Sequence, residues 1–460
     1  MEEGIGAPAP PAPSETAARP LRWNRADTMI LVGLLLLAFS LRFVRLTEPH
    51  AIIFDETYYA RDACLYLGHT QQFCGSPGTT EQSYVHPPLG KWIIAAGIKL
   101  FGWNAFGQRV MAALAGTAIV GVVYLLARTL FRRRLTAALA GLLASTDFLL
   151  LVQSRTAMLD IFLAFFIVLG FFFLALDWQQ VQHMLGPGEM LPGEPRRRWL
   201  RVGAGVAFGA AMACKWSAIP ALGGAVLLSL AWSVSLAAVS VRLPRGERPT
   251  SFLGEMALTF VALGVVPVIV YLASYSVWFA QHDFSLKGFV QLQQTILNFH
   301  ETLRARHAYQ SSAWQWPFVR RPVAFYYQGT PKSSEVLDIG NIATWYAALV
   351  AGGWLVARSV RSWRPERFVA AAWGVQYLPW LLVARPLFFF YMTPIVPFMM
   401  IGLAAGLTRM FDAGRLPRGL VVAFLALGVG VMLWFFYPIL AAVPIPYDLW
   451  HSRMWFPTWI

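Results

Sequence analysis

The chain has 460 residues, of which 57% are hydrophobic and only 13% are charged, and its mean hydropathy is +0.54. An ordinary globular domain is about 45–50% apolar and about 25% charged, so this composition excludes a soluble enzyme, a disordered chain and a disulfide scaffold. The formal net charge of +14 does not indicate nucleic-acid binding, because the basic residues fall in short clusters between apolar runs. The composition predicts an all-α polytopic membrane protein.

The predicted elements begin with a tail, residues 1–27, that is rich in Pro and Ala and is expected to be disordered. The apolar run that follows lacks a cleavage site of small residues, which favours a retained signal anchor. Because a spanning helix needs about 20 apolar residues, we expect about 11 such helices within one transmembrane domain, residues 28–440. Their predicted ranges are 28–46, 107–127, 135–152, 158–177, 202–217, 219–241, 252–274, 341–357, 368–384, 387–408 and 420–440.

Basic residues orient this map, since Lys and Arg are retained on the cytoplasmic side of a membrane. Short segments that hold 21 of the 37 Lys and Arg residues all fall on one side: 1–27, 128–134, 196–201, 242–248, 358–367 and 409–418. We therefore expect a plasma-membrane protein with a cytoplasmic N-terminus. An odd helix count places the tail 441–460 outside. Two long loops, 47–106 and 275–340, then face the extracytoplasmic side and have room for a site.

The first outer loop carries two adjacent carboxylates, Asp55 and Glu56, with Tyr58 close by. Repulsion between the two charges and partial burial raise the cost of ionisation, which suits one of them to act as a general base. The alternative is an acidic pair that caps a helix beginning near Thr57. The residues alone do not decide between these two readings.

The same loop contains two cysteines and a proline motif. Cys64 and Cys74 form a disulfide if the loop faces an oxidising compartment, and two free thiols are the alternative. His86 precedes two prolines that fix an extended kink, and Lys91 and Trp92 suit an interfacial helix. A stiff turn with an incidental histidine is the other reading of this segment.

Charged residues also fall near the outer ends of the predicted helices, where a charge is costly unless it faces a partner or a cavity. The helix map places all of them on the side of Asp55, which suggests a site for a lipid phosphate beside a base, with separate structural ion pairs as the alternative. These residues are Arg109, Arg155, Asp160, Lys215 and Arg385.

In the second outer loop, Trp314 and Trp316 are either interfacial anchors or covers for a sugar or a lipid carrier. The sequence contains no Walker motif, no dinucleotide fingerprint after a predicted strand and no zinc-type His/Cys spacing. These observations disfavour an ATP-driven pump.

Taken together, the motifs resemble the protein O-mannosyltransferases, GT39-family membrane glycosyltransferases of the GT-C class. The similar segments, spread over roughly residues 45–400, are Phe54-Asp55-Glu56, VHPPLGKW at 85–92, Arg109, RTAMLD at 155–160, CKWS at 214–217, His307, Tyr309, Ser311, Trp314, Trp316 and Pro317, and Tyr391, Pro394 and Pro397. Thr57 and Tyr58 replace the His and Tyr that often follow the acidic motif. The large luminal insert of eukaryotic members is missing, which resembles the bacterial form.

The resemblance implies transfer of mannose from polyprenyl-phosphate mannose to Ser or Thr of exported proteins, including chains that emerge from the secretion translocon, with inversion at the sugar carbon. We expect Asp55 to be the base, and Glu56 to orient it or the acceptor. Donor binding is assigned to His86, Arg109, Arg155, Asp160, Lys215, Arg385 and Tyr391, and acceptor contacts to Tyr58, His307, Tyr309, Trp314 and Trp316. No cofactor and no metal are expected, because the leaving group is a lipid monophosphate.

Two other functions fit parts of the sequence. Another GT-C transferase, moving an aminosugar or arabinose from a polyprenyl phosphate, would share the acidic residue but lack the two outer-loop motifs together. A lipid flippase or transporter would show internal repeats and charges near the membrane midplane, whereas here the charges gather at one boundary.

Overall fold

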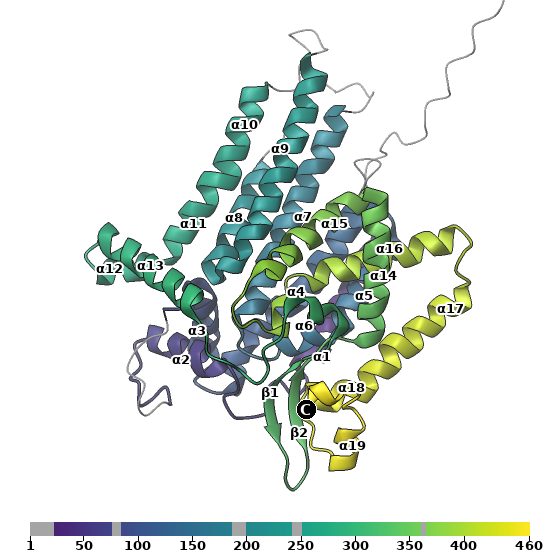
Figure 1. The fold of residues 1–460 in the computed structure, drawn as a ribbon. Helices are drawn as coiled ribbons and strands as arrows, with labels where there is room; N and C mark the ends of the chain where they lie inside the picture. The colour runs from purple at the N-terminus through teal and green to yellow at the C-terminus, as the bar shows by residue number, and fades with distance from the viewer. Residues whose placement is uncertain (1–22, 76–83, 186–198, 242–250, 360–364) are drawn as a thin grey trace, which may run out of the picture.

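The computed structural model describes residues 23–75, 84–185, 199–241, 251–359 and 365–460, and these are mostly helical (Figure 1). The helices and strands are α1 (Arg25–Phe43), α2 (Glu56–Tyr66), α3 (Leu89–Phe101), α4 (Ala105–Phe131), α5 (Arg134–Thr146), α6 (Phe148–Gln153), α7 (Leu159–Leu185), α8 (Trp199–Cys214), α9 (Ile219–Val241), α10 (Phe252–Phe260), α11 (Val266–Ser274), α12 (Ser276–Gln281), α13 (Leu286–Thr302), β1 (Val323–Gln328), β2 (Ser334–Asp338), α14 (Ile342–Ser359), α15 (Pro365–Tyr377), α16 (Val396–Asp412), α17 (Arg418–Ala423), α18 (Met432–Leu440) and α19 (Tyr447–His451).

Long apolar helices confirm a multi-pass membrane protein. Within the described part of the chain, six helical segments are long and apolar enough to cross a membrane, and Trp199–Cys214 is a shorter apolar helix. Each of the eleven predicted ranges overlaps a helix, but the number of spans and their orientation stay predictions. Of the predicted tail, residues 1–22 lie outside the described residues, while Arg25 to Asp27 already form the first turn of α1, capped by Asn24.

Asp147 breaks the predicted helix 135–152 into α5 and α6. Its carboxylate accepts a hydrogen bond from the Leu150 amide at 3.0 Å, which caps α6, and another from the Trp345 indole of α14 at 2.8 Å. A side chain that competes for backbone amides in this way starts a new helix. The Trp345 contact spans 198 residues and is therefore invisible to local sequence patterns.

The prediction of an all-α fold is wrong in one place, because β1 and β2 form an antiparallel hairpin inside the second outer loop. β1 is rich in aromatic residues, and a short segment that contains Gly329 and Pro331 separates it from β2, which is a hairpin pattern. All five residues of β2 are buried. The hairpin is held further by the backbone pair between Ser333 and Ile445.

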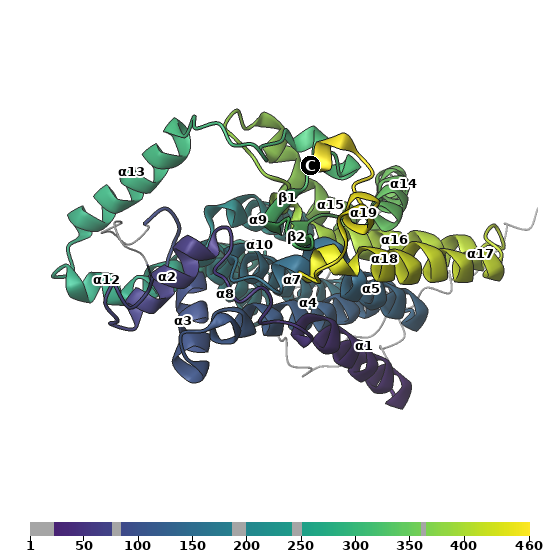
Figure 2. The same ribbon diagram turned by 90° about the horizontal axis from the view of Figure 1, so that it is seen from below.

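The two predicted outer loops and the C-terminal segment gather at one end of the helices (Figures 1 and 2). Arg45, after α1, donates to the Ala442 carbonyl at 3.0 Å, and His300 of α13 bonds to the Val85 carbonyl at 3.2 Å. These long-range contacts bring residues 47–106, 275–340 and 441–460 together. The segment 441–460 is thus part of the folded structure, and α19 lies within it.

Candidate active site

The turn before α2 sends its two adjacent carboxylates in different directions. Glu56 is fully buried, and its two oxygens accept from the Arg109 guanidinium at 2.8 and 2.9 Å, from the Ile53 amide at 3.0 Å and from the Ala157 amide at 2.9 Å. These contacts join the first outer loop to α4 and to the turn before α7. A carboxylate surrounded in this way has no free oxygen for a substrate.

Arg109 of α4 is also fully buried. It makes five hydrogen bonds: two to Glu56 and three to the carbonyls of Leu46, Pro49 and Ala51, at 3.3, 2.8 and 2.9 Å. A guanidinium has five N–H donors, so none remains for a phosphate. The geometry does not support the expected role of Arg109 in donor binding.

Arg155 is likewise used by the protein itself. Its guanidinium donates to the carbonyls of Arg42 at 3.0 Å and Arg45 at 2.7 Å, at the end of α1. A cation beside the unpaired carbonyls of a helix C-terminus stabilises that end. The structure therefore places Arg155 in the support of the site rather than in contact with a substrate. We call Glu56, Arg109 and Arg155 the Glu56 cluster.

Asp55 differs from its neighbour in having few partners. Within the described residues its carboxylate accepts one hydrogen bond, from the Tyr59 hydroxyl at 3.3 Å, and it makes no capping bond to α2. The helix-cap reading is therefore wrong. Burial raises the pKa of Asp55 to about 6, the charge of Lys215 opposes this rise, and the charge of Asp160 adds to it. Asp55 is thus a carboxyl group able to hold or release a proton near neutral pH.

Lys215 and Asp160 pair directly beside Asp55. The Lys215 Nζ atom lies 2.8 and 3.0 Å from the two Asp160 oxygens and 5.5 Å from the centre of the Tyr391 ring. Asp160 stands in the first turn of α7 and Lys215 directly after α8. Gly90 of α3 permits this packing, because a Cβ atom there would lie 2.7 Å from Leu159.

Arg385 is the cation of this region whose guanidinium is not used by the protein. It is half-buried and lies 5.8 Å from the Tyr391 ring, and no hydrogen bond or ion pair to it occurs in the described part of the chain. Tyr391 stacks on Trp380 at 4.7 Å between ring centres, which fixes the ring against which Lys215 and Arg385 both rest. These two cations therefore flank one aromatic surface.

Two histidines complete the group. The His86 ring lies 6.0 Å from the Tyr59 ring and 5.5 Å from the His300 ring. Burial and the charge of Lys215 hold the pKa of His86 well below its usual value, and burial followed by the charge of Arg385 lowers the pKa of His300 to about 4. Both imidazoles are neutral at pH 7. We call Asp55, Tyr59, His86, Asp160, Lys215, His300, Arg385 and Tyr391 the Asp55 site.

His300 was missed by the sequence reasoning. It lies on α13, whose inward face also carries the buried residues Phe289 and Ile296. A single histidine on the apolar face of an amphipathic helix in an outer loop was the available signal.

The second outer loop divides its aromatic residues between core and surface. Trp316 is 1% exposed and its indole donates to Ser311 Oγ at 2.9 Å, so it is neither an interfacial anchor nor a cover for a ligand. Trp314 is 53% exposed and lines a surface hollow of about 450 Å³ away from Asp55. The structure thus does not bring these two tryptophans together at the site.

The remaining predicted acceptor contacts lie near the rim of the site. His307 is exposed, with its ring 6.5 Å from Phe54 and its Nδ1 accepting from the Tyr309 amide at 3.2 Å. Tyr309 is half-buried beneath the Arg321 guanidinium, at 5.2 Å. Tyr58 is 57% exposed. Of these residues, Tyr58 belongs to the Asp55 turn itself, because its amide donates to the Asp55 carbonyl at 2.9 Å, and the His307 ring contacts Phe54 of the same turn.

A cavity of about 150 Å³ adjoins His86, between α2, α3, α12 and α13. Five of its thirteen lining residues are Tyr or Trp, and one of its edges is Ser274, the last residue of Phe252–Ser274, a segment long and apolar enough to cross a membrane. The aromatic residues that line it are Tyr66, Tyr84, Trp92, Tyr275 and Trp278. The cavity therefore extends from the Asp55 site toward the end of a membrane helix.

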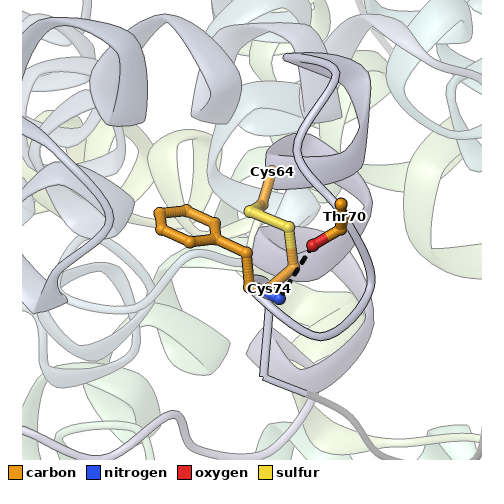
Figure 3. Close-up of a disulfide and its surroundings, with 4 residues drawn as sticks. Cys64, Thr70 and Cys74 are labelled. Carbon is orange, nitrogen blue, oxygen red and sulfur yellow. Dashed lines mark hydrogen bonds between the residues drawn. A yellow bond between two sulfur atoms is a disulfide. The ribbon is translucent and has the colours of Figure 1, made fainter.

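A disulfide joins Cys64 to Cys74, beside Thr70 (Figure 3). It decides the question that the sequence left open and ties the end of α2 to the segment that follows. Among the described residues, no group of three or more His, Cys, Asp or Glu side chains is arranged to hold a metal ion.

Comparisons with known proteins show which family the chain resembles. Residues 32–282 match the family described as dolichyl-phosphate-mannose-protein mannosyltransferase, and residues 285–459 match the C-terminal four-transmembrane region of protein O-mannosyltransferases. A polyprenol-phosphate-mannose–protein mannosyltransferase of Mycobacterium tuberculosis is 32% identical, with 95% of this chain and 92% of the relative covered, and one of Corynebacterium glutamicum is 29% identical, with 98% and 96% covered.

Two solved structures share the fold. The yeast (S. cerevisiae) protein O-mannosyltransferase Pmt1-Pmt2 complex bound to its sugar donor has a chain with a TM-score of 0.78 at 14% identity, with 95% of this chain and 93% of that chain covered. ArnT from Cupriavidus metallidurans bound to undecaprenyl phosphate has a TM-score of 0.55 at 20% identity, with 84% and 60% covered.

Proposed function

The chain belongs to the dolichyl-phosphate-mannose–protein mannosyltransferase family and transfers mannose from polyprenyl-phosphate mannose to proteins, and we propose that the transfer takes place at the Asp55 site. The observation that carries this proposal is a contrast in hydrogen bonding within the described residues. The Asp55 carboxylate accepts one long hydrogen bond and the Arg385 guanidinium makes none, whereas the oxygens of Glu56 and the donors of Arg109 all have protein partners.

In this proposal Asp55 is the general base. Its carboxylate takes the proton of the acceptor Ser or Thr hydroxyl as that oxygen attacks the sugar carbon C1. The bond from C1 to the phosphate oxygen breaks, its electron pair stays on the phosphate, and the configuration at C1 is inverted. A positioned base contributes about 10²- to 10⁴-fold to such a step.

Arg385 and Lys215 receive the charge that develops on the departing phosphate. Arg385 offers an unused guanidinium, which suits bidentate contact with phosphate oxygens. Lys215 shares its charge with Asp160, and it is poised to turn toward the phosphate from that pair. The neutral His86 is placed to donate one hydrogen bond. Because two cations face the leaving group, we expect transfer to persist with a chelator present.

The Glu56 cluster supports the base without contacting substrate. Glu56 fixes the turn that presents Asp55, Arg109 holds the loop carbonyls of Leu46, Pro49 and Ala51, and Arg155 holds the end of α1. The cavity beside His86 is suited to the first isoprene units of the carrier, because its walls are aromatic and it ends at a membrane helix.

We place the site on the extracytoplasmic face of the plasma membrane, with exported proteins as acceptors. Disulfides persist in oxidising compartments, and the Cys64–Cys74 bond lies in the same loop as Asp55. The clusters of Lys and Arg that favour the cytoplasmic side belong to other segments, such as 128–134. Delivery of acceptors from the secretion translocon is part of the same proposal.

Proteoliposomes test the mechanism and the orientation together. Purified protein is supplied with radiolabelled polyprenyl-phosphate mannose and a Ser/Thr-rich peptide, with or without chelator, and protease accessibility of an added N-terminal tag reports which way each molecule is inserted. We expect labelled peptide whose C1 configuration is opposite to that of the donor, formed only where the face opposite the N-terminus meets the peptide. Retained configuration, or transfer on the side of the N-terminus, would refute the proposal.

A further inference from the structure

His300 carries a buried hydrogen-bond acceptor, Nδ1, that has no partner among the described residues. Its Nε2 lies 3.2 Å from the Val85 carbonyl, which can only accept, so the ring proton is on Nε2 and Nδ1 has a free lone pair. Nδ1 is shielded from solvent and no described residue bonds to it. Buried polar atoms are nearly always paired in folded proteins, so this atom calls for an explanation.

His300 lies among the residues that the proposal assigns to the phosphate of the donor. The ring lies 5.5 Å from His86 and 6.2 Å from Trp216, and it feels the charges of Arg385 and Lys215, the two cations assigned above to the phosphate. In Figure 2, α13 extends from α12 as an arch away from the helical bundle. The arch brings His300 onto the turn that contains Val85 and His86.

The protonation of the ring selects the kind of group that it can bind. A lone pair on neutral nitrogen repels the oxygens of a phosphate, which carry no proton to donate, whereas a hydroxyl donates to it readily. Burial, and after it the charge of Arg385, lowers the pKa of His300 and so opposes a second proton on the ring. His300 is therefore unsuited to the phosphate itself and suited to a hydroxyl attached close to that phosphate.

We propose that His300 Nδ1 accepts a hydrogen bond from a hydroxyl of the donor's mannosyl group, and that His300 thereby helps to select the sugar. The inference rests on the proposed function, because it takes the phosphate to lie between Arg385 and Lys215. The acceptor hydroxyl is the less suitable partner. Its proton goes to Asp55, and Tyr59 and His86 lie between Asp55 and His300.

Two amide substitutions distinguish the roles of the two ring nitrogens. His300→Gln places an amide near the Nε2 position, keeps a donor for Val85 and removes the acceptor at Nδ1. His300→Asn places a carbonyl oxygen near the Nδ1 position and gives up the Val85 bond. We expect His300→Gln to lower kcat/KM for the mannosyl donor about tenfold to a hundredfold, with the KM for the peptide unchanged, and His300→Asn to recover much of that loss.

Deoxymannosyl donors then identify the partner. Wild type, His300→Gln and His300→Asn are each assayed with donors that lack one hydroxyl at a time. For one deoxy position, the penalty seen in wild type should vanish in His300→Gln, because the two changes remove the same hydrogen bond. If every deoxy donor lowers kcat/KM equally in wild type and in His300→Gln, the inference is overturned. A rise in the KM for the peptide in place of the expected loss would overturn it as well. Equal losses in both variants, following their melting temperatures, would show a structural role and overturn it too.

The proposed function fails in a different way. If Arg385→Gln leaves binding of the undecaprenyl phosphate headgroup unchanged, measured as a thermal shift without turnover, the phosphate is not between these cations. That result is independent of the hydroxyl penalties in the His300 variants, which compare one sugar with another on the same carrier.

Discussion

Asp55 and Glu56 are neighbours in the chain but belong to two regions with opposite chemistry. In the Glu56 cluster, each carboxylate oxygen and each guanidinium donor of Arg109 has a protein partner. In the Asp55 site, Asp55 has one long hydrogen bond, and Arg385 and His300 Nδ1 have none within the described residues. Saturated charges hold the outer loop on the helices, and in the proposed function the unsaturated ones bind substrate.

The difference has an energetic basis. Removing one member of a buried ion pair leaves an uncompensated charge, which costs about 3–5 kcal/mol, so the Glu56 cluster is expected to control folding. A polar group without a protein partner does not stabilise the fold, so its removal is expected to change the free energy of unfolding little. The two regions should therefore respond to mutation in opposite ways.

The largest expected effect is that of Asp55→Asn. Loss of the base should reduce the rate of mannosyl transfer by about 10²- to 10⁴-fold, while the melting temperature in detergent should not fall, because a partly buried carboxylate is removed rather than a satisfied one. Initial rates and thermal unfolding of the same preparation check this. Transfer at the wild-type rate would show that Asp55 is not the base.

Arg109→Met should act on stability instead. It leaves Glu56 buried without its cation, and we expect the free energy of unfolding to drop by about 3–5 kcal/mol. Denaturant unfolding in detergent measures this, and the double variant Arg109→Met/Glu56→Gln is the control, since removing both charges should restore part of the loss. If Arg109→Met is as stable as wild type but cannot bind donor, the arginine is a phosphate ligand after all.

A smaller effect is expected for Arg385→Gln. Loss of a charge-assisted hydrogen bond to the leaving phosphate should lower kcat/KM for the donor about tenfold to a hundredfold, with little change in melting temperature. Arg304→Gln is the matched control, because Arg304 is exposed and its guanidinium bonds only nearby carbonyls of Glu301 and Leu303. Equal behaviour of the two variants would remove Arg385 from the site.

The mildest test is the pH dependence. The pKa of Asp55 is raised to about 6, chiefly by burial, and a base must be deprotonated, so kcat/KM should fall about tenfold per unit as pH drops below 6. Folding favours the protonated form of a group whose pKa is raised, so this loss does not come from unfolding. His86 and His300 stay neutral there. The residual activity of Asp55→Asn should not fall with pH in this way. If it does, the pH dependence comes from another group.

Local patterns in the sequence were sufficient for much of the fold. Apolar runs marked the helices that are apolar enough to cross a membrane, whereas α13, with 17 residues, fell inside a predicted outer loop. The order of motifs from Phe54 to Pro397 indicated the family. The break at Asp147 and the β1–β2 hairpin were not found, because Asp147 depends on Trp345 far along the chain and the strands are short segments within a loop. The cysteine pair was recognised as a candidate, but its bonding was not decided.

By itself, the sequence determined that the protein lies in a membrane and that carboxylates and cations meet at one end of it. Composition and charge bias are enough for this, because they decide which segments avoid water and need no knowledge of contacts. Only the tertiary structure decided which charges are free. Arg109 and Arg385 look alike in the sequence, but five acceptors from loop and helix converge on the first and none of the described residues bonds to the second. A hydrogen-bond inventory depends on segments far apart in the chain, and that inventory separates the residues that build this site from those that act in it.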